Sequence, residues 1–166
     1  MNTKTNPSLL SKLEEWAGRK GMSGTDVIES AVNGFYTRAV SDTRLAKFFV
    51  DADLDSLKHH QSQFMNKLFS GEKAGGYTAE QLHKIHERLI AEKELKSVHF
   101  DYFIESLTAA LSEVGLSVPL MEEVHSHLKP FRSIFEQATT QYSMSREERL
   151  FSPWTMMPTV ACQRVT

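Results

Sequence analysis

Apolar side chains recur every three or four residues along most of the chain, which is the spacing of amphipathic helices. This periodicity predicts helices at about 8–19, 28–39, 54–68, 79–90, 99–114 and 119–135. Glycine and proline gather at the junctions between these segments, and the period-two alternation of strands is scarce. The pattern therefore predicts an all-α fold.

Two polar residues interrupt these apolar faces. On the third predicted helix, Gln61 lies in the middle of the face formed by Leu57 and Phe64. On the fourth, His86 lies four residues after Leu82, on the same face. Local departures from an otherwise consistent pattern are expected at functional sites, so both residues are candidates.

Composition limits the classes of protein that fit. The chain has 166 residues, of which 40% are hydrophobic and 24% charged, as expected for one globular domain. A net charge of −2 argues against a general nucleic-acid binder, and no apolar run reaches the roughly 20 residues of a membrane span. The N-terminus lacks the pattern of a secretory signal, and the single cysteine, Cys162, cannot form an internal disulfide. We therefore expect no nucleic-acid partner, no membrane span and a cytoplasmic location.

The polar residues in the apolar faces suggest a shared chemistry. Tyr36 on the second helix and His60 beside Gln61 can face the same space as His86. Phenylalanines supply an aromatic wall, at positions 35, 48, 49, 64 and 100. An apolar cavity with one histidine on one side and tyrosine plus glutamine opposite suits haem, whose iron is held by one imidazole while hydrogen-bond donors stabilise a bound diatomic ligand. Each residue alone also has a structural interpretation, as a satisfied core histidine, a core tyrosine or an amide bonded to backbone.

Four runs of sequence resemble a group I truncated haemoglobin. They are AVNGFYTRAVSDTRLAKFFVDADL, LKHHQSQFMNKLFSG, GGYTAEQLHKIHERLI and VHFDYFIESLTAALSEVG, within about residues 25–136. The resemblance implies a truncated 2-over-2 globin-like helical sandwich with an extra N-terminal helix and an irregular C-terminal tail. The expected organisation is an N-terminal extension helix at 1–24, a truncated globin domain at 25–140 and a C-terminal tail at 141–166.

The resemblance also implies roles for individual residues. His86 matches the proximal histidine that ligates the haem iron, and Tyr36 and Gln61 match distal residues that hydrogen-bond bound oxygen. His60 matches a position that either ligates the iron from the distal side or contacts a propionate, and the sequence leaves both roles open. The remaining positions that match haem contacts, pocket walls or tunnel-gating sites are Phe35, Phe49, Leu57, Phe64, Met65, Tyr77, Leu82 and Phe100.

Several departures from the family pattern stand out. The glycines between the first two helices are separated, and the loop before Tyr77 is longer by about two residues than usual. That loop therefore leaves the placement of the fourth helix open, although the spacing from Tyr77 to His86 matches the family.

The function implied is that of a haem b protein that reversibly binds dioxygen, nitric oxide and carbon monoxide. Within it, nitric oxide dioxygenation with a reductase partner competes with a six-coordinate electron-transfer or sensor protein, and we expect a monomer or weak homodimer. An alternative of another class is a non-haem di-iron bundle, since Glu80 and His83, and Glu122 and His125, are Glu-x-x-His pairs. A helical interaction module without a cofactor is the third alternative.

Overall fold

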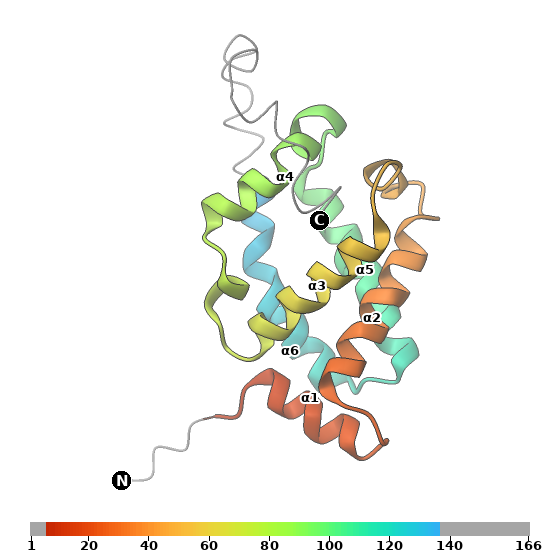
Figure 1. The fold of residues 1–166 in the computed structure, drawn as a ribbon, viewed down its shortest axis with the longest axis vertical. Helices are drawn as coiled ribbons and strands as arrows, with labels where there is room; N and C mark the ends of the chain where they lie inside the picture. The colour runs from red at the N-terminus through yellow and green to blue at the C-terminus, as the bar shows by residue number, and fades with distance from the viewer. Residues whose placement is uncertain (1–5, 137–166) are drawn as a thin grey trace.

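The protein is described by a computed structural model over residues 6–136, which form helices joined by short connections (Figure 1). Within this range the α-helices are α1 (Leu9–Gly18), α2 (Gly24–Ala39), α3 (Leu54–Phe69), α4 (Ala79–Lys93), α5 (Ser97–Val114) and α6 (Val118–Leu128). Short 3₁₀ turns lie at Ala46–Phe48 (η1), Lys73–Gly76 (η2) and Lys129–Phe131 (η3), and residues 132–136 are again helical. The prediction of an all-α fold is confirmed.

Polar side chains fix the starts of three helices. Ser23 accepts a hydrogen bond from the backbone N–H of Asp26 at 3.0 Å, and the Asp26 carboxylate accepts one from the Ser23 N–H at 2.8 Å. Thr78 and Gln81 make the same reciprocal pair at the start of α4, and Asp53 caps α3. These bonds satisfy N–H groups that the first helical turn leaves unpaired. Each cap therefore fixes the residue at which its helix begins.

Two layers of helices enclose the core. α2 packs against α5 and α3, and α6 packs against α5 and α3 as well. α1 lies across one end of the molecule, against α2 and α6 (Figure 1). Its Leu9, Leu13 and Ala17 are buried in the same cluster of apolar side chains as the residues of α2 and α6. The N-terminal helix therefore shares the main hydrophobic core.

α4 is set apart from these packed layers, and this separation makes room for a cavity. Figure 1 shows α4 beside the packed helices, and α4 contacts η1, which precedes it by about 30 residues in the sequence. Its buried residues are Leu82, Leu89 and Ile90, on the side that faces the other helices. The helix that carries His86 therefore forms one wall of an opening, with α2, α3 and α5 opposite.

The connection from α3 to α4 includes a glycine that no other residue replaces easily. Gly75 has φ of +62°, and a Cβ atom there would lie 2.4 Å from the Phe64 ring. L-residues with side chains rarely adopt this backbone region, and a contact this short forces a shift of the ring. The extra length of this connection is taken up by η2, which brings its backbone against the Phe64 side chain.

The structure refines several predicted boundaries. α5 begins at Ser97, two residues before the predicted start at His99, and Pro130 interrupts the last predicted helix at η3. The interruption follows from the missing N–H and fixed φ of proline. The predicted irregular tail at 141–166, which includes Cys162, lies outside the described residues.

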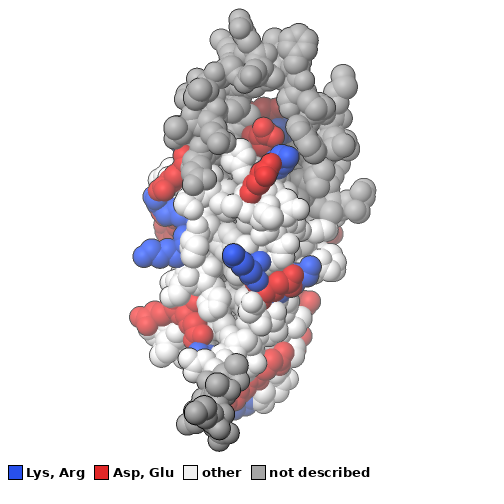
Figure 2. All heavy atoms as spheres, turned by 90° about the vertical axis from the view of Figure 1, so that its left-hand side faces the viewer, with Lys and Arg blue, Asp and Glu red and all other residues white. Residues whose placement is uncertain are grey.

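The surface mixes charges of both signs. On the face shown in Figure 2, acidic and basic side chains lie next to one another around uncharged areas. Ion pairs connect elements that are distant in sequence, such as Lys12 with Glu123 at 2.8 Å and Arg44 with Glu105 at 3.2 Å. Among the described residues, none of the helices is both long and apolar enough to span a membrane.

Candidate functional site

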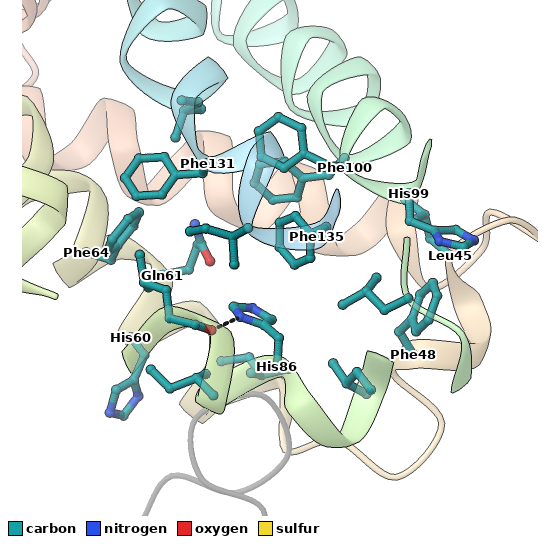
Figure 3. A pocket seen from close by; sticks show the side chains of 18 of the residues that line it. Leu45, Phe48, His60, Gln61, Phe64, His86, His99, Phe100, Phe131 and Phe135 are labelled. Atoms are coloured by element: carbon teal, nitrogen blue, oxygen red, sulfur yellow. Dashed lines mark hydrogen bonds between the residues drawn. The ribbon is translucent and has the colours of Figure 1, made fainter. Parts of the chain in front are cut away.

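A cavity of about 220 Å³ lies between α4 and the packed layers (Figure 3). Most of its lining is aromatic or aliphatic. It is lined by nearly all of the residues singled out from the sequence: Phe35, Tyr36, Phe49, Leu57, His60, Gln61, Phe64, Tyr77, Leu82, His86 and Phe100. Phe48, expected as part of the aromatic wall, also lines it.

Met65 is the exception among the candidate residues. Its side chain is only 2% exposed, packed in the hydrophobic core, and it is not among the residues that line the cavity. Met65 lies one position after Phe64 on α3, so its side chain points about 100° round the helix axis from the cavity face. The Met65 side chain therefore belongs to the packed hydrophobic core, and the structure does not place it in the cavity wall.

His86 projects from α4 into the middle of the cavity (Figure 3). Its Nδ1 lies 2.7 Å from the backbone carbonyl oxygen of Leu82, one turn earlier on the same helix. A carbonyl can only accept a hydrogen bond, so Nδ1 is the donor and Nε2 carries the lone pair in the neutral ring. This is the tautomer that a metal-binding imidazole needs, with the second nitrogen oriented by a backbone acceptor.

Tyr36 and Gln61 belong to the opposite wall, on α2 and α3. Tyr36 is buried, and its ring makes edge contacts with Phe35 at 4.9 Å and Phe49 at 5.6 Å between centroids. Figure 3 shows Gln61 reaching toward the centre of the cavity, on the same side as Phe64. A hydroxyl and an amide thus enter an otherwise apolar space from the side opposite α4.

His60 lies at the rim of the cavity and shares one feature with His86. Its Nδ1 is 2.8 Å from the backbone oxygen of Ser56, again one turn earlier. This bond makes Nε2 the nitrogen with the lone pair. In Figure 3 the His60 ring is turned away from the centre, toward which His86 points. Its exposed neighbour His59 contacts it edge-on, with ring centroids 5.7 Å apart.

Sequence reasoning did not assign a further set of residues to the site. Besides the expected ones, the cavity is lined by Leu45, Ile85, Leu89, Leu95, His99, Phe103, Leu128, Phe131, Ile134 and Phe135. Most of them are apolar residues on helix faces that the periodicity assigned to a generic core. Only the distances between helices distinguish a cavity wall from a core position, and these distances are not encoded in a local pattern.

His99 is the titratable residue in this additional set. It opens α5, where its Nδ1 accepts a hydrogen bond from the backbone N–H of Lys96 at 2.9 Å. Its ring packs edge-on against Phe48, with centroids 4.8 Å apart. Burial lowers the pKa of His99 from its usual 6.5, and the positive charge of Lys47 lowers it further. The ring is therefore held neutral and acts as a cap for α5.

The donors present fit haem. The cavity offers the His86 imidazole, with an oriented Nε2 directed at its centre, aromatic walls for a flat macrocycle, and polar groups on the opposite side. The di-iron alternative finds no such support. Within residues 6–136, no three histidine, cysteine, aspartate or glutamate side chains gather closely enough to hold a metal ion. Glu80 instead faces Lys84, and His125 is hydrogen-bonded to Thr108 at 2.7 Å.

Comparison with known proteins decides the family. The family model for bacterial-like globins matches residues 21–137. The chain is 33% identical over 103 residues to the group 1 truncated haemoglobin GlbN of Synechocystis, covering 62% of this chain and 82% of that protein. The chain belongs to the bacterial-like globins, among the group 1 truncated haemoglobins. The predicted family is confirmed.

Solved structures show the same fold. The 2/2 haemoglobin of Synechococcus, solved with covalently attached haem, has a TM-score of 0.64 and 29% identity, covering 77% of this chain and 97% of that one. The protein THB1 of Chlamydomonas reinhardtii has a TM-score of 0.62 and 30% identity, covering 78% and 97%. The predicted 2-over-2 globin fold is confirmed, and the truncated haemoglobin uses haem iron to bind diatomic ligands such as dioxygen.

Proposed function

We propose that this truncated haemoglobin holds its haem iron through His86 and stabilises bound ligands through Tyr36 and Gln61. One observation carries the proposal: the His86 imidazole enters an apolar cavity with Nδ1 hydrogen-bonded to the Leu82 carbonyl. An imidazole oriented in this way, within a wall of aromatic rings, is well suited to bind the iron of a haem.

The opposite wall supports the distal part of the proposal. A bound haem would supply an iron that can coordinate a diatomic gas, and Tyr36 and Gln61 line the wall across the cavity from α4. The Tyr36 hydroxyl and the Gln61 amide can each donate a hydrogen bond to a ligand that carries partial negative charge. Because the surrounding side chains exclude water, such bonds are stronger here than in solvent. Phe49 and Leu57 complete this apolar wall.

We further propose nitric oxide dioxygenation as the reaction of this site. Nitric oxide and dioxygen combine to nitrate with the uptake of one electron, so turnover requires a reductase partner. Two donors opposite the imidazole favour retention of dioxygen until nitric oxide arrives, because a hydrogen bond to a charged acceptor contributes about 1.5–3 kcal/mol. Slow dioxygen release with fast nitric oxide consumption is therefore the expected behaviour.

Absorption spectra of the full chain supplied with haem test the proposal. We expect an intense Soret band in the wild type and its loss or strong reduction in His86→Ala. A matched control is His83→Ala, which removes a half-buried histidine from the same helix and is expected to retain haem. Stoichiometric haem uptake by His86→Ala with an unchanged ferrous spectrum would show that another residue is the ligand.

Nitric oxide consumption tests the reaction itself. We expect the oxygenated wild type, mixed with nitric oxide in a stopped-flow instrument, to yield nitrate in one rapid step. If the wild type binds haem but produces no nitrate, the proposed dioxygenation is contradicted and only the proposal of ligand binding stands.

A second candidate, a six-coordinate haem protein for electron transfer or sensing, is favoured by one observation. His60 presents Nε2 through the same bond to a preceding carbonyl as His86 does. Two imidazoles on the iron would produce sharp, split visible bands in the ferrous protein. We expect His60→Ala to convert such bands into the single broad band of an open distal site, and wild-type bands that are already broad would exclude His60 as a ligand.

The proposal also includes the cellular location and the oligomeric state of the protein. We expect a cytoplasmic protein that is a monomer or weak homodimer. Sedimentation of the haem-loaded chain over a range of concentrations measures the oligomeric state, and a tight dimer at low concentration would contradict it.

A further inference from the structure

The segment after α6 forms part of the wall beside His86. It begins with η3 at Lys129, directly after α6, and continues through helical residues 132–136. Three of its apolar side chains line the cavity: Phe131, Ile134 and Phe135. The helical stretch after Pro130 therefore supplies one wall of the site.

Within this wall, Phe135 contacts the His86 imidazole directly. The two rings meet edge-on, with centroids 5.3 Å apart and planes at 76° (Figure 3). On its other side Phe135 packs on Phe100 of α5, at 5.8 Å between centroids. The Leu82 carbonyl accepts a hydrogen bond from one nitrogen of the imidazole. The Phe135 ring limits rotation of the imidazole about the bond that joins it to Cβ of His86. Contacts of this kind set the orientation of a metal-binding imidazole.

An ion pair fixes the segment that carries Phe135. The Arg132 guanidinium donates from Nε to Oδ1 of Asp101 at 2.9 Å and from Nη2 to Oδ2 at 3.0 Å. Asp101 follows Phe100 directly on α5, and Arg132 precedes Phe135 by one helical turn. The fork therefore joins the two short stretches that bear Phe100 and Phe135, whose rings are in contact. The hydrogen bonds from Arg132, and secondarily its charge, also hold the pKa of Asp101 below its usual value.

We propose that the Asp101–Arg132 pair is a positioning device for the iron ligand: it holds Phe135 against His86 and so sets the rotation of the imidazole at the iron. This inference rests on the proposed role of His86 as the axial ligand. Both members of the pair are part-exposed and neither touches the cavity, so their effect on the iron passes through Phe135. A planar fork suits this role, because two parallel hydrogen bonds fix direction as well as distance.

Resonance Raman spectroscopy of the haem-loaded full chain, ferrous and without added ligand, tests the proposal. The readout is the iron–histidine stretching band, which responds to imidazole orientation. We expect the band to shift or broaden in Phe135→Leu, Asp101→Asn and Arg132→Gln. Arg132 also pairs with Glu136, so the double variant of Asp101 and Arg132 is expected to shift the band no further than Arg132→Gln alone.

Two further measurements sharpen the test. We expect high salt to move the wild-type band toward that of Asp101→Asn and to leave the variant unchanged, because salt screens part-exposed charges. We also expect Phe135→Leu to lose haem about three- to tenfold faster, the effect of one edge contact between rings. The matched control is Glu113→Gln, which removes an ion pair with Arg38 from the far end of α5 and is expected to leave the band in place.

Two outcomes would overturn the inference. One is a band at the wild-type position in both Asp101→Asn and Arg132→Gln, whatever Phe135→Leu does. The other is an equal shift in Glu113→Gln, which would indicate a general effect of loosening α5. If His86 is not the iron ligand, the iron–histidine band will persist in His86→Gly without added imidazole. This result separates failure of the proposed function from failure of the present inference. Asp101→Asn is isosteric and part-exposed, so the comparison does not depend on a variant that disrupts the core.

Discussion

At the scale of single residues, the site depends on polar groups placed in apolar surroundings. Tyr36 is 5% exposed, so its hydroxyl acts in a setting where water competes weakly. Gln61 and His86 were noticed from the sequence because each breaks an apolar stripe. Phe35 and Phe49, in contrast, follow the apolar pattern, and the sequence marks them only as aromatic residues that could form the wall of a cavity.

Tyr36→Phe is expected to release dioxygen about tenfold faster than the wild type. The substitution keeps the ring contacts with Phe35 and Phe49 and removes only the hydroxyl donor, whose loss corresponds to about 1.4 kcal/mol. Stopped-flow displacement of dioxygen by carbon monoxide measures the rate. Tyr102→Phe, on α5 outside the cavity lining, is the control and is expected to leave the rate unchanged. A rate for Tyr36→Phe equal to that of the wild type would assign the donor role to another group.

His99 gives the stability of the protein a dependence on pH. Its pKa is lowered in the folded chain relative to 6.5 in the unfolded one, so the unfolded chain binds the proton first. The contribution of His99 is present in full above pH 6.5 and declines as the pH falls below it. We expect urea unfolding between pH 7.5 and 5 to show a smaller loss of stability in His99→Gln than in the wild type. Parallel curves for the two proteins would contradict the argument.

At the scale of elements, the helices and their caps follow from local sequence. The reciprocal bonds of Thr78 with Gln81 involve residues three positions apart, so the sequence alone indicates them. At the start of α2 the sequence offers Ser23, Thr25 and Asp26 as caps, and the structure shows Ser23 with Asp26. The helical character of residues 132–135 and the interruption at Pro130 were also predicted. The contact of this segment with α5 was not, because the Asp101–Arg132 fork joins residues 31 positions apart.

The α3–α4 connection offers a test at this scale. Gly75→Ala is expected to destabilise the protein by about 1–3 kcal/mol more than Gly21→Ala. Both glycines have positive φ, +62° and +72°, so the backbone strain is matched. A Cβ at Gly75 meets the Phe64 ring at 2.4 Å, whereas nothing lies within 4 Å at Gly21. Thermal or urea unfolding of the two variants checks the difference, and equal destabilisation would show that the ring simply moves aside.

At the scale of the whole molecule, α1 is part of the core, although the family resemblance begins after it. Leu9 and Leu13 are each 1% exposed, and Lys12 pairs with Glu123 of α6. The amphipathic spacing of these leucines predicted the helix but not its partners, since an apolar stripe does not say which surface it covers. The sequence likewise predicted the polar and aromatic groups of the cavity, but not the additional apolar residues of α5 and of the segment after α6 that line it.

Leu13→Ala is expected to lower the free energy of unfolding by about 2–4 kcal/mol, the cost of a cavity in a packed core. Leu10→Ala, at a part-exposed position on the same helix, is the control and is expected to cost less. Denaturant unfolding followed by circular dichroism measures both. A cost for Leu13→Ala no larger than that for Leu10→Ala would indicate that α1 is only loosely attached.

The hydrogen bond from His86 to the Leu82 carbonyl also governs the movement of protons. Since Nδ1 already carries the hydrogen that it donates, a neutral His86 can bind iron without gaining, losing or transferring a proton. The helix itself selects the tautomer, so the imidazole is oriented before any haem binds.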